Sequence, residues 1–177
     1  MKVTELKISG VFVIENFVHF DDRGTFVKTY NKEQFERIIG NFTIKEAYFS
    51  ISKKDTIRGM HFQLPSAEHA KLVYLISGAV TDVVLDIRKN SPTYGKFELI
   101  NLKPCSSSVY IPIGCAHGFK ALEDNSLMCY NQNSAYDKDK DAGILFSSFG
   151  YDWAIEDPIL SDRDSSFPSF HNFSSPF

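Results

Sequence analysis

The sequence lacks the features that define several large classes of protein. Its 3 cysteines, Cys105, Cys115 and Cys129, form neither a paired disulfide framework nor the spacing of metal ligands. No apolar run approaches the length of a membrane span, and residues 1–10 lack the apolar core of a signal peptide. We therefore expect a soluble protein of the reducing cytoplasm, without an integral membrane anchor.

An excess of positive charge is also missing. The chain carries 19 Lys and Arg against 22 Asp and Glu, which gives a formal net charge of -3 at pH 7. Such a chain has no overall attraction for nucleic acid, so an anion site must be a local cluster of cations. The candidate cations are Arg23, Arg58 and Lys71. We expect no nucleic-acid partner.

Strand signals dominate the chain, whose 177 residues fit one domain, residues 1–177. They recur at short intervals between Gly, Pro, Asn and Asp, which predicts an all-β sandwich or barrel. Residues 70–88 indicate two strands joined near Ser77-Gly78. The other strand-like segments are 11–20, 25–30, 97–102, 108–112, 117–121 and 127–133.

Only residues 31–40 have a helical pattern. Asn31 is the expected N-cap, Gln34 stands at capping-box spacing and Gly40 supplies the stop. The tail from Ser165 onward is rich in Ser, Phe and Pro, so it is either a strap across the surface or a frayed end.

Residues 57–63, followed by Lys71, place a guanidinium, an imidazole and an ammonium within one hairpin-sized stretch. An imidazole acts as a general base near neutral pH, while fixed cations hold phosphate or stabilise an oxyanion. The combination therefore suits an anionic substrate that must lose a proton. In an extended strand Arg58 and His61 lie on opposite faces unless Gly59 bulges the strand. Taken alone, a His in an apolar strand is more often a hydrogen-bonded core residue.

A second motif, Pro-x-Gly-x-x-His, spans residues 112–117 and has the spacing of the second cupin motif. The first cupin motif in metal enzymes carries His-x-His followed by Glu, whereas here Gln63 stands at the second ligand position. Glu68 and His69 are potential substitutes, although a solvated turn is the simpler interpretation. We therefore predict no bound metal.

Further motifs follow in a fixed order: Asp22-Arg23-Gly24-x-Phe26, Lys71-Leu72-Val73, Asp86-Ile87-Arg88-x-x-Ser91-Pro92-Thr93-Tyr94-Gly95 and Leu160-Ser161-x-x-Asp164. With these motifs, the chain from about residue 11 to 164 resembles the dTDP-4-dehydrorhamnose 3,5-epimerase family. The resemblance implies an all-β, cupin-type jelly-roll barrel, to which the sequence adds one short helix near the N-terminus. It also implies a homodimer with exchanged N-terminal strands and neither a metal nor a redox cofactor. The implied reaction is the epimerisation, at C3 and/or C5, of a nucleotide-diphosphate 4-keto-6-deoxy sugar destined for surface polysaccharide such as capsule or lipopolysaccharide.

The resemblance assigns catalytic roles. His61 matches the general base, and Asp164 matches the carboxylate that orients it. Lys71 matches the cation beside the developing oxyanion, and Tyr130 matches the acid that delivers a proton to the opposite face. Stabilisation of the enolate is required because protons beside a ketone are far less acidic than an imidazolium. Without the resemblance, Tyr130 would be interpreted as a core aromatic residue and Asp164 as a surface turn residue.

The resemblance also assigns residues to the substrate pocket: Arg23, Arg58, Gln63, His117 and Tyr136. The two arginines match diphosphate-binding positions, for which a planar donor fork is apt. Tyr136 matches a tyrosine near the pyrophosphate. Asp82 and Asp86 lie in barrel strands, where we interpret them as structural hydrogen-bond hubs rather than catalysts.

Three further positions assigned to substrate binding depart from the family pattern. Lys28 stands where the family commonly has Glu, Glu46 where Gln is usual, and Tyr48 where Asn is usual. Because the catalytic matches persist, these departures indicate the same chemistry on another sugar nucleotide, activated by GDP or CDP or carrying a 6-deoxy-heptose. Glu46 is a candidate acceptor for the N1 and N2 donors of guanine.

Three classes of function are therefore compared. A metal-independent epimerase is favoured because His61, Tyr130 and Asp164 occur together. A sugar-nucleotide 3,4-ketoisomerase on the same fold is disfavoured by the match at Tyr130. A noncatalytic sugar-nucleotide binding module would keep the arginines and lose the acid or the base. The sequence leaves open which nucleotide and sugar are bound, and whether C3, C5 or both are inverted.

Overall fold

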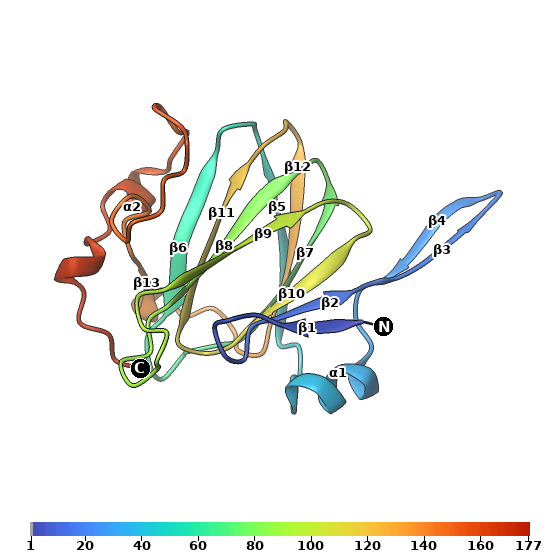
Figure 1. Ribbon diagram of the computed structural model, residues 1–177, viewed down its shortest axis with the longest axis horizontal. Coiled ribbons are helices and arrows are strands. Elements are labelled where there is room, and N and C mark those ends of the chain that lie inside the picture. Colours follow the sequence, from blue (N-terminus) through green and yellow to red (C-terminus); the bar gives the residue numbers. More distant parts are fainter. Residues whose placement is uncertain (1) are drawn as a thin grey trace.

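The computed structural model describes residues 2–177 and is mostly β, as Figure 1 shows. All strand pairs are antiparallel. A six-stranded sheet has the order β1-β2-β10-β7-β12-β5, a five-stranded sheet has the order β13-β6-β11-β8-β9, and β3 and β4 form a separate hairpin. The strands are β1 Val3–Glu5, β2 Phe12–Glu15, β3 Phe17–Asp21, β4 Gly24–Lys28, β5 Glu46–Ser52, β6 Ile57–Gln63, β7 Lys71–Ser77, β8 Val80–Asp86, β9 Phe97–Leu102, β10 Ser107–Ile111, β11 Cys115–Ala121, β12 Ser126–Gln132 and β13 Asp141–Gly143; the helices are α1 Lys32–Ile39 and α2 Asp162–Ser165, with 3-10 turns at Lys138–Lys140 and Phe170–Asn172. The predicted jelly-roll fold is confirmed.

The main core lies between the two large sheets. It is built by alternate residues of their inner faces, including Val73, Val84, Val109, Phe119 and Met128, none more than 1% exposed. Burying a large aliphatic or aromatic side chain stabilises a fold by roughly 1.5–3 kcal/mol. This inner layer therefore fixes the two sheets face to face, and with them the walls of the cavity described below.

The outer face of the five-stranded sheet is also covered. Met60, Val83 and Leu85 are buried there against Phe149 and Trp153 from the C-terminal segment. In Figure 1 this segment, coloured orange to red, runs outside β6 and β13. Because both faces of β6 and β8 are covered, residues of these strands are buried along most of their length instead of at alternate positions.

The C-terminal tail is a strap, which settles the choice between a strap and a frayed end. The backbone N–H of Lys89 donates to the carbonyl of Phe177 at 2.9 Å. The hydroxyl of Ser175 donates to the carbonyl of Ile87. Phe173 packs edge to face on Phe62 of β6, with ring centroids 5.2 Å apart.

The sequence-based elements agree with the structure in most places. The helix is confirmed: the side chain of Asn31 accepts from the N–H of Gln34 at 3.1 Å, and Gly40 ends the helix with a φ of +74°. Segment 11–20, expected as one strand, is broken between β2 and β3 at Asn16. The expectation of a single short helix was wrong, because α2 forms a second one near the C-terminus.

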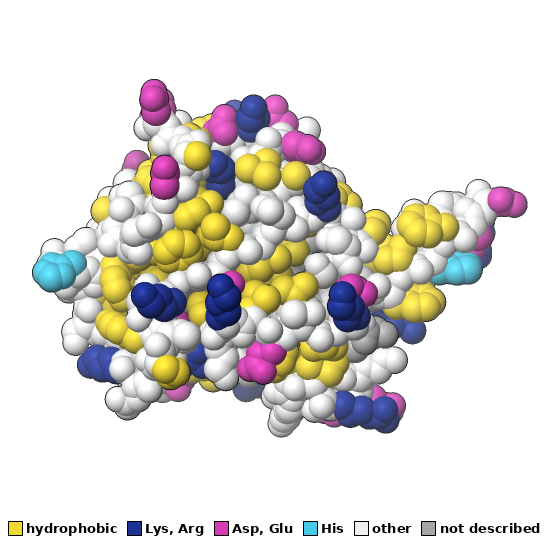
Figure 2. Space-filling model, in the orientation of Figure 1, with side chains coloured by type: hydrophobic (Ala, Val, Ile, Leu, Met, Phe, Trp, Pro, Cys, Tyr) yellow, Lys and Arg dark blue, Asp and Glu magenta, His cyan; other side chains and the backbone are white. Residues whose placement is uncertain are grey.

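The β3–β4 hairpin projects from the body of the molecule (Figure 1). Phe17, Phe20 and Phe26 on this hairpin are 57%, 71% and 57% exposed. Figure 2 shows hydrophobic side chains along the projection. An apolar hairpin in this position lacks a covering layer within residues 2–177, and a surface of this kind marks an interaction site.

Candidate active site

One cavity of about 560 Å³ opens between the two sheets. Its walls come from β5, β6, β7, β11 and β12, together with residues near β13 and α2. The predicted site residues that line it are Glu46, Tyr48, Arg58, His61, Gln63, Lys71, His117, Tyr130 and Tyr136. Asp164 lies behind His61 and is 3% exposed. The structure therefore brings most of the predicted site together.

His61 and Asp164 form a hydrogen-bonded pair, with His61 Nε2 2.8 Å from Asp164 Oδ1. A carboxylate only accepts hydrogen bonds, so Nε2 carries the proton and Nδ1 keeps its lone pair in the neutral ring. The other carboxylate oxygen accepts from the N–H of Gly59 at 3.0 Å. Burial lowers the pKa of His61, and the contact with Asp164 partly opposes that change. The ring is thus held neutral, as a base requires.

Gly59 produces the bulge that the sequence required. Arg58 pairs with Phe119 and His61 with His117, so β6 has one more residue than β11 between the two pairs. Gly59 has a φ of +145°, and a Cβ there would lie 2.5 Å from the Cα of Gly118. Only glycine fits this conformation and spacing. The bulge turns both Arg58 and His61 toward the cavity.

Tyr130 approaches the cavity from the opposite wall, because β12 belongs to the six-stranded sheet and β6 to the other. Its ring stacks on Tyr48, with centroids 4.7 Å apart and planes at 15°. The two hydroxyls of Tyr130 and Ser50 are 3.1 Å apart. Burial raises the pKa of Tyr130 and raises that of Tyr48 to about 12, so both phenols carry their protons at neutral pH. Tyr130 also belongs to the main core, so it is a core aromatic residue as well as a residue of the cavity wall.

Lys71 supplies a buried cation. Burial lowers its pKa to about 8, against the opposing influence of Asp141 and Asp82. Within residues 2–177 its ammonium makes one long hydrogen bond, 3.4 Å, to the carbonyl of His61. A cation with such sparse hydrogen bonding retains donors for an anion.

Arg163 is a further cation that the sequence-based reasoning missed. It lines the cavity and donates to Asp141 at 2.6 Å and to Asp164 at 3.3 Å. Its position immediately before Asp164, inside the motif at residues 160–164, was the available signal. The pair is fixed by α2, where Ser161 caps the helix by accepting from the N–H of Asp164 at 3.1 Å.

Gln63 and Glu46 hold a loop. The side-chain amide of Gln63 donates to the carbonyl of Asp137 at 2.7 Å and accepts from its N–H at 3.2 Å. The carboxylate of Glu46 accepts from the N–H of Tyr136. Both side chains were expected to bind substrate; in the structure they anchor the segment that presents Tyr136 to the cavity.

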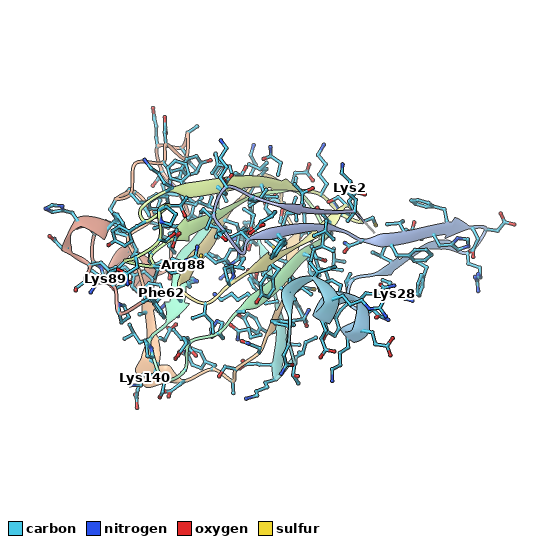
Figure 3. All side chains as sticks on the ribbon, turned by 60° about the horizontal axis from the view of Figure 1, so that its bottom comes forward. Lys2, Lys28, Phe62, Arg88, Lys89 and Lys140 are labelled. Carbon is cyan, nitrogen blue, oxygen red and sulfur yellow. The ribbon has the colours of Figure 1, made fainter. Side chains whose placement is uncertain are left out.

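Arg23 and Lys28 lie outside the cavity of their own chain. Arg23 is bound to Asp21 at 2.6 Å, and its side chain is 88% exposed. Lys28 lies over the ring of Phe17, 5.9 Å from its centroid. Figure 3 shows Lys28 near the base of the projecting hairpin, far from Phe62 beside the proposed base. A single chain thus does not bring these two predicted substrate contacts to the site.

His117 pairs with Asp82 through Nε2, 2.6 Å from Oδ1. Both side chains are buried, and Oδ2 of Asp82 has no hydrogen-bond partner within residues 2–177. Asp82 is therefore the partner of one histidine rather than the hub that we expected. Asp86 is such a hub: despite burial, hydrogen bonds from Arg88, Ser91 and Thr93 lower its pKa to about 2.

The turn at Glu68 and His69 is less solvated than expected. Both ring nitrogens of His69 are buried, as is Oε2 of Glu68, and burial lowers the pKa of His69 to about 3.

Within the described part of the chain, no three His, Cys, Asp or Glu side chains gather as metal ligands would. No helix among those residues is long and apolar enough to cross a membrane.

Comparisons with known proteins agree with this geometry. The family model described as dTDP-4-dehydrorhamnose 3,5-epimerase matches residues 5–172. The dTDP-4-dehydrorhamnose 3,5-epimerase of Shigella flexneri is 38% identical over 168 residues, which cover 93% of each protein. The RmlC epimerase of Mycobacterium tuberculosis has a TM-score of 0.92 and 36% identity, covering 97% of this chain and 89% of that one. ChmJ, a 3'-monoepimerase from Streptomyces bikiniensis in complex with dTDP-quinovose, has a TM-score of 0.87 and 29% identity, covering 93% of this chain and 86% of that one.

These relatives share one fold and one class of reaction, so the chain is an isomerase, an epimerase that acts on carbohydrates. More particularly, it belongs to the dTDP-4-dehydrorhamnose 3,5-epimerase family, which acts on dTDP-sugars in deoxysugar biosynthesis. The resemblance drawn from the motifs is confirmed.

Proposed function

We propose that the protein inverts C3, C5 or both in a dTDP-activated 4-keto-6-deoxy sugar, with His61 as base and Tyr130 as acid. The observation that supports this proposal is the position of the two groups on opposite walls of one cavity. Inversion requires a proton to leave one face of a carbon and another to arrive at the opposite face. Two groups on one wall would return the original configuration.

The proton balance runs through an enolate. His61 takes the proton of the carbon beside the ketone, and the electron pair of that bond moves to the C4 oxygen. The hydroxyl of Tyr130 then protonates the same carbon on its other face, and the C4 carbonyl re-forms. The imidazolium of His61 releases its proton to solvent and the tyrosinate takes one up from solvent, which restores both groups. The hydroxyl of Ser50, 3.1 Å from the phenol oxygen, is a hydrogen-bond partner through which that proton can return.

A base alone cannot drive the first step, because the carbon acid and the imidazolium differ by roughly 13 pKa units, or about 18 kcal/mol. The rest must come from stabilisation of the oxyanion in a site that excludes water. Lys71 is the buried cation available for this role. Arg58 and Arg163, which also line the cavity, provide guanidinium forks for the diphosphate.

A homodimer would complete the site. The exposed apolar hairpin β3–β4 carries Arg23 and Lys28, neither of which lines the cavity of its own chain. Strand β5 is the free edge of its sheet, and Phe49 and Ile51 on it are 63% and 55% exposed. We propose that the hairpin of a second copy covers this edge and delivers Arg23 to the cavity.

Size-exclusion chromatography with light scattering tests the dimer. A fully active monomer would refute the exchange. Replacing Phe20 and Phe26 together by Ser should weaken both association and nucleotide binding.

The choice of dTDP follows from relatives that act on dTDP-sugars and from the use of Glu46. Its carboxylate already accepts a hydrogen bond from the N–H of Tyr136, so fewer of its acceptor sites remain for the donors of a guanine base. The departures at Lys28 and Tyr48 still favour a sugar that differs from the common one, such as a 6-deoxy-heptose. We place the product in the supply of deoxysugars for surface polysaccharide, with the enzyme in the cytoplasm.

Incubation in deuterated water with dTDP-4-keto-6-deoxyglucose tests the proposal, with the GDP-activated analogue as a matched comparison. Deuterium uptake at C3, C5 or both, with inverted product, is the expected result by NMR. Movement of the ketone to C3 would identify a 3,4-ketoisomerase. Tight binding without exchange would identify a noncatalytic module.

A further inference from the structure

The segment after Leu160 places a phenylalanine against the proposed base. The ring centroid of Phe167 lies 5.8 Å from that of His61, with the planes at 72°, an edge-to-face contact. The guanidinium of Arg163 lies 5.3 Å from the centroid of the same phenyl ring. Arg163 also donates to Asp164, the partner of His61. The ring of Phe167 thus contacts both His61 and Arg163, and Arg163 in turn contacts Asp164.

The backbone fixes Phe167 in this position. Gly143 of β13 is the ladder partner of His61, and a Cβ at Gly143 would overlap the ring of Phe167. Next to Phe167 in the chain, the carbonyl of Pro168 accepts a hydrogen bond from the N–H of Leu145 at 2.9 Å. The ring is therefore packed against β13 on one side and against the imidazole on another.

The charged and titratable groups that face His61 come from several elements. Asp164 and Arg163 come from α2, Lys71 from β7, and His117 lies opposite on β11. Burial has the largest influence on the pKa of His61 and lowers it. The ring of Phe167 is part of that apolar surrounding, so its removal would admit water beside the imidazole.

We infer that Phe167 is a positioning residue, whose ring holds the imidazole of His61 in the orientation set by Asp164 and shields it from water. The inference rests on the proposed role of His61 as base. A base that can move loses rate more than binding, because its geometry matters in the proton-transfer step. The strap is thus part of the catalytic geometry as well as a cover for the sheet.

Two variants and a matched control test the inference. Phe167→Ala removes the ring, Phe167→Leu keeps an apolar side chain, and Phe173→Ala removes a ring of the same strap that packs on Phe62 instead. Each protein is measured by NMR titration of His61 without substrate and by kcat and KM for deuterium exchange. Phe167→Ala should lower kcat by roughly tenfold or more with little change in KM. The pKa of His61 should rise, so the acidic limb of the pH profile moves to higher pH.

Phe167→Leu should change kcat and the pKa of His61 in the same directions but by less, and Phe173→Ala should change neither. The inference is overturned if folded Phe167→Ala keeps the wild-type titration and kcat, or if Phe173→Ala matches it. If Phe167→Ala does not fold, wild-type behaviour of Phe167→Leu overturns it. If the Phe167 variants behave like wild type while His61→Asn is inactive, only the inference about Phe167 fails and His61 remains the proposed base. If His61→Asn is active, the proposal that His61 is the base fails.

Discussion

Two histidine–aspartate pairs lie side by side in the site and differ in what surrounds them. His61 on β6 and His117 on β11 are directly opposite in one antiparallel ladder. The Nε2 atom of His61 is 2.8 Å from Asp164, and that of His117 is 2.6 Å from Asp82. Both rings line the same cavity. Distance within the pair therefore does not separate them.

Exposure and the second carboxylate oxygen do separate them. The side chain of His61 is 26% exposed and that of His117 is 3% exposed. Asp164 has a second partner in the N–H of Gly59, whereas Oδ2 of Asp82 has none within residues 2–177. A partly exposed ring on a well-bonded carboxylate suits proton exchange with a substrate. A buried ring that is the only partner of its carboxylate is needed for stability.

The largest expected effect is the loss of exchange in His61→Asn. A missing general base costs 10²–10⁴-fold, and we expect deuterium uptake at C3 and C5 to fall by roughly 10³-fold. Stability should change little, because Asp164 keeps its bonds to Gly59 and Arg163. Near-normal exchange by the folded variant would exclude His61 as the base.

Tyr130→Phe should separate deprotonation from inversion. The ring volume hardly changes, so packing against the core and Tyr48 should survive. The enolate can still form and be reprotonated by the imidazolium on the original face. We expect inverted product to fall by about 10²-fold while some deuterium enters with retained configuration, measured by NMR on one sample. Tyr48→Phe is the control for the stacked ring; full inversion in Tyr130→Phe would identify another proton donor.

His117→Leu should reveal the structural pair. It leaves the carboxylate of Asp82 buried without its partner, and breaking a buried pair costs roughly 3–5 kcal/mol. Urea unfolding should show this loss, whereas His61→Asn should show little. Replacing Asp82 and His117 together by Leu removes the stranded charge and should recover most of the stability. Equal stability of the single and double variants would contradict this account.

The pH profile should show a smaller effect with two limbs. Activity rises with pH as His61 loses its proton. Because burial lowers the pKa of His61, this acidic limb lies at a pH below the ordinary pKa of histidine. Activity falls above about pH 8, because the pKa of Lys71 is lowered to about 8 and the oxyanion then loses its cation. In kcat/KM, which reports the free enzyme, the decline approaches tenfold per pH unit. Lys71→Arg should remove this alkaline limb, and a limb unchanged in that variant would assign it to another group.

Sequence reasoning recovered elements whose pattern is local. The two strands in residues 70–88 and helix α1 carry their own signals: a turn at Ser77-Gly78, and a cap at Asn31. The turn does not make a hairpin, because β7 and β8 belong to different sheets. Strand β5 was missed because most of its residues are exposed, so no buried face repeats. Strands β1 and β13 have 3 residues each, too few to show a period.

The candidate site was recovered as a set of residues rather than as a set of contacts. His61 and Asp164 are 103 residues apart, and only the motif resemblance linked them before the fold placed them together. Gln63 and Glu46 were read as substrate contacts because nothing local shows that they hold the loop at Tyr136. Partners across a fold depend on tertiary packing, which one sequence does not display.

The smallest expected effect is that of chelation, for which we expect no change in turnover. A cupin metal site would need a third ligand beside His61 and His117, and within residues 2–177 no three His, Cys, Asp or Glu side chains gather as metal ligands. The amide oxygen of Gln63, at the remaining ligand position, accepts from the N–H of Asp137. This oxygen would have to give up that hydrogen bond to bind a divalent ion. Activity before and after EDTA, with metal content measured on the same samples, checks this; a loss of turnover restored by added divalent metal would show that the donors rearrange around an ion.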